Sequence, residues 1–136
     1  MTENEDHFLE EIRAELSLDS PEQARPFVKS VLQALRRTVS RQNAEGMVRL
    51  FPEFLKSYFM TSGKEEKEVD VEHLDELVEL VMTRDQQEQT ALFKSEVQTL
   101  SVILPTLRRI FTGHDPNTVA GIKYPLYQEF LTSTSY

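Results

Sequence analysis

Apolar side chains recur every three or four residues along most of this chain, a spacing that places them on one face of an α-helix. The longest such stripe follows a Ser-Pro step. Ser20 can serve as its N-cap, Pro21 suits the first helical position, and Gln23 completes a capping box. This pattern predicts a helix of about five turns, with an apolar face formed by Ala24, Val28, Val31, Leu35 and Val39.

Three other apolar stripes predict further helices. An acidic helix near the N-terminus has a stripe formed by Phe8, Leu9, Ile12 and Leu16. Asp70 can cap a helix that runs to Thr83 and buries Val71, Leu74, Leu77, Val78 and Val81. Asp85 and Glu88 form a second capping box before a long helix, whose stripe contains Phe93, Val97, Leu100, Leu104, Leu107 and Phe111.

Prolines and polar caps divide the chain between these stripes. Ser40 can cap a short helix that ends at Phe51, because Pro52 disfavours helical dihedrals in the residue before it. A further apolar helix then runs to Gly63, and Pro105 predicts a kink in the long helix. No stretch alternates apolar and polar residues long enough to predict a strand. The sequence therefore predicts an all-α fold, a compact helical bundle of about six to eight helices.

Two segments of the chain share one order of features. SVLQALRRTVSRQNAEGMVRLFPEFLKSYFMTS aligns, with small gaps, with SVILPTLRRIFTGHDPNTVAGIKYPLYQEFLTS. Each has a helix ending in Leu-Arg-Arg, a capping turn, a short helix, an aromatic-proline pair and an apolar helix ending in Thr-Ser. We interpret this order as the duplication of a helix hairpin, which needs the second hairpin to bury its apolar face.

The predicted organisation is one domain, residues 1–136. Its parts are an acidic helix in residues 1–18, a first helical repeat in 20–61, an acidic connector and helix in 62–85, and a second helical repeat in 86–131.

The first repeat resembles a known family. Its features are the spacing of Ala24, Val31, Leu32, Leu35 and Arg36, followed by a capped short helix that runs into Phe51-Pro52. This pattern is similar to the repeated unit of the bacterial domain-of-unknown-function family 2267. The resemblance spans residues 20–131. It implies a helical fold with two such units, and it implies no activity, cofactor or catalytic residue.

Composition excludes several kinds of site and partner. The chain has 136 residues and no Cys, which excludes disulfides, cysteine nucleophiles and cysteine-ligated metals. Its first residues lack the basic and apolar regions of a signal peptide, and no apolar run is long enough to span a bilayer. We therefore expect a soluble, cytoplasmic protein that contacts no membrane. A net charge of −8 also disfavours a nucleic-acid partner, because phosphates attract positive surfaces.

The charge is unevenly distributed, with −6 in residues 1–19, +4 in 20–61, −7 in 62–100 and +1 in 101–136. The positive regions coincide with the repeats, each of which ends its long helix with an arginine pair: Arg36 and Arg37, then Arg108 and Arg109. Cations in the last turn of a helix stabilise its negative end, and this is our first interpretation of the pairs. The alternative is that the duplication brings them together to bind an acidic partner or a phosphate.

The three histidines lack the neighbours that catalysis or metal binding requires. Di-metal helical bundles need two Glu-x-x-His motifs and inward-facing acids, whereas this chain has only Asp70-x-x-His73 and acids opposite its leucines. His114 lies in a turn, where it could act as a base, but no nucleophile motif or glycine-rich phosphate loop accompanies it. We predict no catalytic residue, no metal site and no cofactor.

Aromatic residues gather near the two aromatic-proline pairs. Most should be buried, and any that are exposed would mark an interface; the candidates are Phe54, Tyr58, Tyr124 and Tyr127. We predict a non-enzymatic helical module for interaction or regulation, which binds a protein partner or a second copy of itself. The alternative is a helical bundle that binds a small anion or phosphate through Arg36, Arg37, Arg108 and Arg109.

Overall fold

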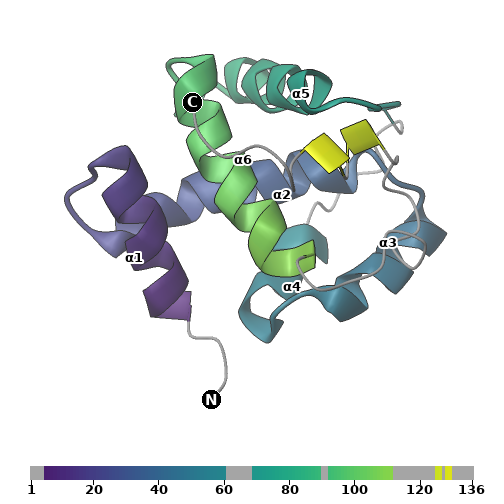
Figure 1. The fold of residues 1–136 in the computed structure, drawn as a ribbon, viewed down its shortest axis with the longest axis horizontal. Helices are drawn as coiled ribbons and strands as arrows, with labels where there is room; N and C mark the ends of the chain where they lie inside the picture. The colour runs from purple at the N-terminus through teal and green to yellow at the C-terminus, as the bar shows by residue number, and fades with distance from the viewer. Residues whose placement is uncertain (1–4, 61–68, 90–91, 112–124, 127, 130–136) are drawn as a thin grey trace.

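The chain is all-helical in the part that the computed structural model describes, which is residues 5–60, 69–89, 92–111, 125–126 and 128–129 (Figure 1). This confirms the predicted fold class. None of the described helices is long and apolar enough to cross a bilayer. In chain order the elements are α1 Glu5–Leu16, the 3₁₀ turn η1 Pro21–Ala24, α2 Arg25–Arg36, α3 Arg41–Met47, the 3₁₀ turn η2 Val48–Leu50, α4 Glu53–Met60, α5 Leu74–Gln87 and α6 Glu96–Phe111.

Helix α2 lies at the centre of the bundle, where it contacts α4, α5 and α6 (Figure 1). It begins later than predicted, because Pro21 starts a 3₁₀ turn and Pro26 falls in the first turn of α2. A proline is tolerated there, since the first amides of a helix have no helical acceptor. The predicted apolar face, namely Ala24, Val28, Val31, Leu35 and Val39, is buried. The predicted length of five turns was wrong, because α2 has 12 residues and ends at Arg36.

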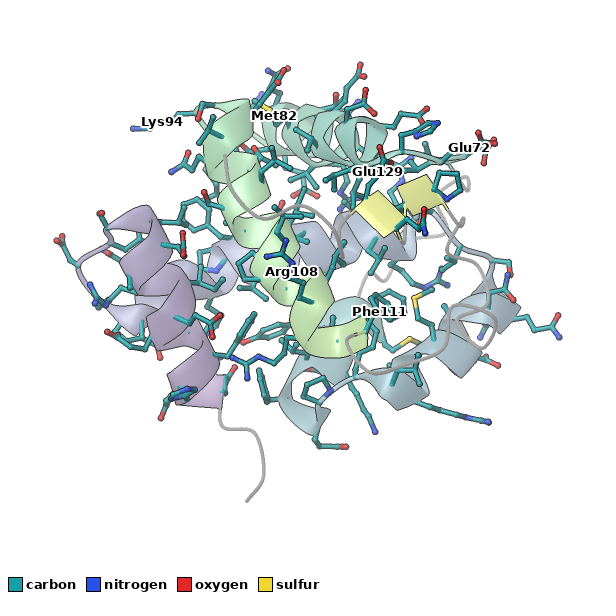
Figure 2. All side chains as sticks on the ribbon, viewed as in Figure 1. Glu72, Met82, Lys94, Arg108, Phe111 and Glu129 are labelled. Carbon is teal, nitrogen blue, oxygen red and sulfur yellow. The ribbon has the colours of Figure 1, made fainter. Side chains whose placement is uncertain are left out.

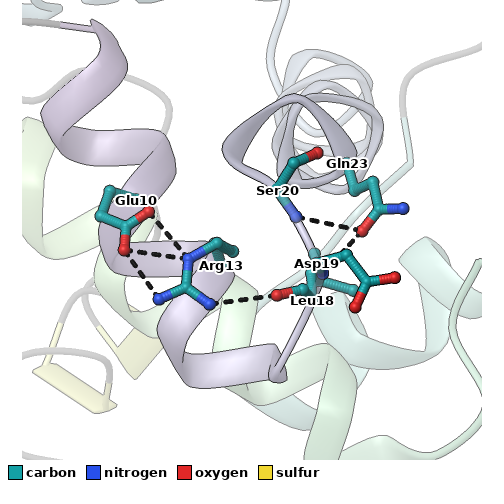
Figure 3. A network of polar contacts seen from close by, with 6 residues as sticks. All are labelled: Glu10, Arg13, Leu18, Asp19, Ser20 and Gln23. Atoms are coloured by element: carbon teal, nitrogen blue, oxygen red, sulfur yellow. Dashed lines mark hydrogen bonds and ion pairs between the residues drawn. The ribbon is translucent and has the colours of Figure 1, made fainter.

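A short turn joins α1 to α2 (Figure 3). Arg13 donates from Nη1 to the carbonyl of Leu18 at 3.0 Å. The side-chain oxygen of Gln23 accepts amide hydrogen bonds from Asp19 and Ser20 at 2.8 and 3.3 Å. The predicted capping box at Ser20 is therefore confirmed, although it starts a 3₁₀ turn rather than an α-helix.

The boundaries predicted between α2 and α4 are also confirmed. Ser40 Oγ accepts the amide hydrogen bond of Asn43 at 3.1 Å and so caps α3. Phe51 has an extended backbone, with φ −79° and ψ 143°, directly before Pro52. The helix cap and the proline each affect residues within three positions in the chain, so the local sequence is sufficient to predict both boundaries.

Helix α5 does not begin where it was predicted to begin. Its N-cap is His73 rather than Asp70, and Glu76 Oε1 accepts the amide hydrogen bond of His73 at 3.0 Å. A capping box needs Glu or Gln three residues after the cap. Glu76 stands in that position for His73, whereas the third residue after Asp70 is His73 itself.

The capping box predicted at Asp85 was wrong, because α5 continues to Gln87 and includes Asp85. The Asp85 carboxylate instead accepts the amide hydrogen bonds of Leu92 and Phe93, each at 3.0 Å. Asp85 is buried, and it ties the connection between α5 and α6 to the end of α5.

Helix α6 is buried on more than the one predicted stripe, because it contacts α1, α2 and α5. Val97, which the stripe placed in the core, is 56% exposed. Figure 1 shows that the first turn of α6, which holds Val97, projects beyond α2. The buried residues of α6 are Thr99, Ser101, Val102, Ile103, Leu104, Thr106, Leu107, Ile110 and Phe111.

The internal duplication lies only partly within the described residues. The first repeat, residues 20–61, contains α2, α3 and α4. In the second repeat, residues 86–131, the first two residues still belong to α5, and α6 stands in the place of α2. Most of the chain after α6 lies outside the described residues, as does Gly63, so the duplication stays a prediction.

Candidate functional site

An open groove of about 1070 Å³ runs along α5 and the start of α6. Figure 2 shows Glu72 and Glu129 toward one end of α5 and Met82 toward the other. Among the residues that the structure describes, those that line the groove include no Lys or Arg. Six of them are acidic, namely Glu72, Asp75, Glu76, Glu79, Glu96 and Glu129, and four are apolar, namely Leu74, Val78, Met82 and Leu100.

The apolar part of the groove comes from one edge of the α5 stripe. Leu74, Val78 and Met82 follow one another at four-residue spacing, so they share a face of the helix. Leu74 and Val78 are buried, while Met82 and Leu100 are only partly buried. Some apolar surface therefore remains accessible beside the carboxylates, and methionine is a side chain that adapts readily to a partner surface.

Four carboxylates of the groove form no ion pair with any cation in the described part of the chain, and their side chains are exposed; they are Glu72, Asp75, Glu79 and Glu96. Like charges three or four residues apart on a helix repel one another by a few tenths of a kcal/mol per pair. By contrast, several acids on other surfaces are paired, including Glu10 with Arg13, Glu22 with Arg25, Glu53 with Lys56 and Glu88 with Arg84. The groove therefore presents negative charge that no Lys or Arg of the described residues neutralises.

The other two acidic residues hold the start of α5. Glu76 completes the capping box. Glu129 accepts the amide hydrogen bond of Leu74 at 3.0 Å, and its carboxylate lies 3.2 Å from Nδ1 of His73. A carboxylate is favoured at this position because the N-terminal end of a helix carries partial positive charge. Sequence reasoning missed Glu129, which is 55 residues from Leu74, and no local spacing could have indicated it.

The acids of the groove lie in a row and do not converge on one point. Among the described residues, no group of three or more His, Asp or Glu side chains could hold a metal ion. His73 is the one histidine among the described lining residues of the groove, and His114 lies outside the described residues. Chemically, this arrangement suits a long surface that is both cationic and apolar.

The two arginine pairs lie at the ends of α2 and α6, which reach different parts of the bundle (Figure 1). Arg36, the last residue of α2, donates from Nη1 to the carbonyl of Val39 at 3.2 Å. The backbone carbonyl of Arg37 accepts the amide hydrogen bond of Val69 at 2.8 Å. None of the contacts between described residues brings the two pairs together, so a shared anion site stays a prediction.

Arg109 links α6 to α1. Its Nη2 lies 2.6 Å from the Glu11 carboxylate, and its side chain is only 19% exposed. Its guanidinium carbon lies 5.2 Å from the centre of the Phe8 ring, within the range of a cation–π interaction. Its neighbour Arg108 is partly buried on α6 (Figure 2). Arg109 therefore acts in the packing of α1.

Two of the four candidate interface aromatics can be placed, and both lie on α4. Phe54 is partly buried, and its ring centre is 6.0 Å from that of Phe8. Tyr58 is partly buried as well. Tyr124 and Tyr127 lie outside the described residues. The two described aromatics thus help to join α4 to α1.

Tyr58 is part of a polar cluster that joins three helices. Its hydroxyl donates to the Glu5 carboxylate of α1 and accepts a hydrogen bond of 2.6 Å from Nη1 of Arg25. Burial, together with the Glu5 carboxylate, raises the pKa of Tyr58 to about 12. Hydrogen bonding to Glu22, with smaller contributions from Tyr58 and Glu5, raises the pKa of Arg25.

The fold and the groove together define a class of protein, an all-α bundle with an acidic groove on its surface. The chain belongs to the family described as uncharacterized conserved protein DUF2267, whose model matches residues 5–121. This confirms the predicted family, although the match begins at residue 5 rather than 20 and ends at residue 121 rather than 131. The match includes all the described α-helices and ends before Glu129. A comparison with curated proteins gave no match.

Proposed function

We propose that this protein is a non-enzymatic interaction module that docks another protein in the groove along α5. One observation carries the proposal: four carboxylates that form no ion pair with a described residue line the same groove as the accessible apolar side chains of Met82 and Leu100. Complementary charge at an interface speeds encounter and selects the partner, while buried apolar contacts supply much of the affinity. A partner with cationic residues around an apolar centre provides both the complementary charge and the apolar contacts.

A phosphate-binding bundle has less support. Arg36 and Arg109 each bind groups of this same chain, namely the Val39 carbonyl and the Glu11 carboxylate. The groove itself would repel a phosphate or another anion because its lining is acidic. We place the module in the cytoplasm, because its 136 residues contain no cysteine and so no disulfide that would need an oxidising compartment.

Site-specific photo-crosslinking in the native cells tests the proposal. A photoreactive residue at Met82, in the full-length chain, should yield a discrete adduct with another protein. The same residue at Glu15, which is exposed on α1, should not yield it. Glu79→Lys in the Met82 variant should remove the adduct. Equal adducts from both positions, or an adduct that survives Glu79→Lys in a folded chain, would show that the groove is not the docking surface.

A further inference from the structure

We infer that the partner presents a cationic amphipathic helix of three to four turns to the groove. This inference rests on the proposed docking function and specifies the segment that docks. It follows from three properties of the groove: its length, the order of charged and apolar side chains along it, and the carboxylates whose presence helix capping does not explain.

The groove follows α5, which contains 14 residues. At a rise of about 1.5 Å per residue, such a helix is about 21 Å long. An extended peptide would cover this length with about six residues and would have unpaired backbone groups, because the described part of the groove is helical and offers no strand edge to bind them. A helix satisfies its own backbone hydrogen bonds, so only its side chains need partners in the groove.

The carboxylates of the α5 side and the accessible apolar side chains lie toward different ends of the groove, because Leu74 and Val78, which lie among the carboxylates, are buried. Glu72, Asp75 and Glu79 lie toward the start of α5, and the uncharged Met82, Thr83 and Gln86 lie toward its end. Figure 2 shows Glu72 and Met82 toward opposite ends of α5. The docked helix should therefore place its basic residues over the start of α5 and an apolar anchor over Met82.

The start of α6 borders the apolar end of the groove. Glu96 and Leu100 lie four residues apart on α6, so they share one face of that helix. Leu100 extends the apolar surface beside Met82, and Glu96 adds one carboxylate at its edge. A single basic residue beyond the apolar anchor completes the complementary pattern.

Helix stability explains some of these acids but not all of them. Asp75 and Glu96 lie in the first turns of α5 and α6, where the helix dipole favours negative charge. Glu72 lies before α5, and Glu79 lies beyond its first turn, so neither receives this stabilisation to the same degree. Removing these two carboxylates should therefore weaken binding of the partner helix while changing the stability of α5 little.

Fluorescence anisotropy with the purified full-length chain tests the inference. The probes are three 14-residue peptides: a lysine-leucine amphipathic helix, a scrambled peptide of identical composition without an apolar face, and the amphipathic helix with every lysine replaced by glutamate. At about 0.15 M salt, where exposed charges are partly screened, the first should bind at least about tenfold more tightly than the second. The third should not bind. Equal affinity for the first two would overturn the inference, because charge alone would then be recognised.

Variants of the groove provide the second part of this test. Glu72→Gln with Glu79→Gln should weaken binding of the cationic helix about tenfold, and Met82→Gln should also weaken it. The matched control Glu15→Gln removes one exposed charge from α1 and should leave affinity unchanged. Unchanged affinity in the double variant would overturn the inference.

The inference and the proposed function fail in different ways. A Met82 adduct with a partner whose cross-linked segment is acidic or non-helical would overturn the cationic helix and leave the docking function intact. The expected peptide affinities without any Met82 adduct in cells would overturn the docking function, while the preference of the groove for cationic helices would stand.

Discussion

Single charged residues in this protein differ in what they contact. Arg109 is largely buried between the Glu11 carboxylate and the Phe8 ring, whereas Arg36 donates to the carbonyl of Val39 in the turn directly after its own helix. Both arginines end a helix in the sequence, yet only Arg109 connects two distant helices. Their contributions to stability should therefore differ.

Arg109→Ala should lower the free energy of unfolding by about 1 to 2 kcal/mol, because it removes a partly buried ion pair and a cation–π contact. Arg36→Ala removes a helix-end cation and should cost about 0.3 to 1 kcal/mol. Urea unfolding of the two variants measures both values. If Arg109→Ala costs no more than Arg36→Ala, Arg109 does not hold α1 to α6.

Tyr58 should make stability depend on alkaline pH. The fold raises its pKa from 10.0 to about 12, so the folded state favours the neutral phenol. This stabilisation is fully present below pH 10 and is lost as the pH rises toward 12. Tyr58→Phe cannot ionise, so the variant should lose less stability than the original protein over this interval.

Urea unfolding between pH 8 and pH 11.5 measures the difference. At neutral pH, Tyr58→Phe should itself cost about 1 kcal/mol, because it leaves the Glu5 carboxylate without the phenol hydrogen bond. An identical alkaline loss of stability in both proteins would show that other groups dominate the pH dependence.

Among the elements, the connection between α5 and α6 depends on one buried carboxylate. Asp85 accepts the amide hydrogen bonds of Leu92 and Phe93. These hydrogen bonds hold the residues before α6 against the end of α5. They therefore also hold the end of the groove where α5 and α6 meet. The other end depends on Glu129, which caps α5 from a distant part of the chain.

Asp85→Ala should lower the free energy of unfolding by about 2 to 3 kcal/mol, because it leaves backbone amides without acceptors. Gln87→Ala, at an exposed position near the end of the same helix, should change it by less than about 0.5 kcal/mol. Thermal unfolding compares the two variants, and amide hydrogen exchange should accelerate at Leu92 and Phe93. Unchanged exchange at these amides would show that Asp85 does not hold the connection.

Across the whole molecule, negative charge is concentrated where the proposed partner docks. Residues 62–100 carry a net charge of −7, close to the −8 of the complete chain. Arginines or lysines compensate several acids on other surfaces, while four carboxylates of the groove form no ion pair with a residue that the structure describes. Such a surface lowers the stability of the free protein slightly and favours a cationic partner.

Glu72→Gln with Glu79→Gln should therefore stabilise the free protein by a few tenths of a kcal/mol at low salt. That gain corresponds to a rise in Tm of about 1 to 3 °C. It should vanish near 1 M salt, where charges are screened within about 3 Å. Calorimetry at both salt concentrations tests this, with Glu15→Gln as the control. A lower Tm, or a rise that is independent of salt, would contradict the repulsion argued for the groove.

The sequence predicted some features of the fold and of the groove more completely than others. The cap at Ser40 and the break at Phe51 were predicted correctly, because each depends on residues within three positions. The start of α5 was predicted wrongly although its signal is also local, because the capping box of His73 and Glu76 lies within three positions and Asp70 was preferred as the cap. The exposure of Val97 was predicted wrongly because it depends on where neighbouring helices end.

The candidate site shows the same division. The sequence indicated an acidic face on the helix that became α5, but it assigned partner binding to arginines and aromatics elsewhere. Glu11 and Arg109 are 98 residues apart, and Glu129 and Leu74 are 55 residues apart. No helical spacing links positions so distant, so their contacts could not be predicted from the order of residues.

The sequence by itself determined which segments are helical, because apolar periodicity, caps and prolines act over one or two turns. It also determined the family and the acidity of residues 62–100. Only the tertiary structure decided that Arg109 joins α6 to α1, that Glu129 caps α5, and that the acids of α5 line the same groove as Met82 and Leu100. The physical reason is that these arrangements arise when separate helices pack together, and packing places residues side by side that are far apart in the chain.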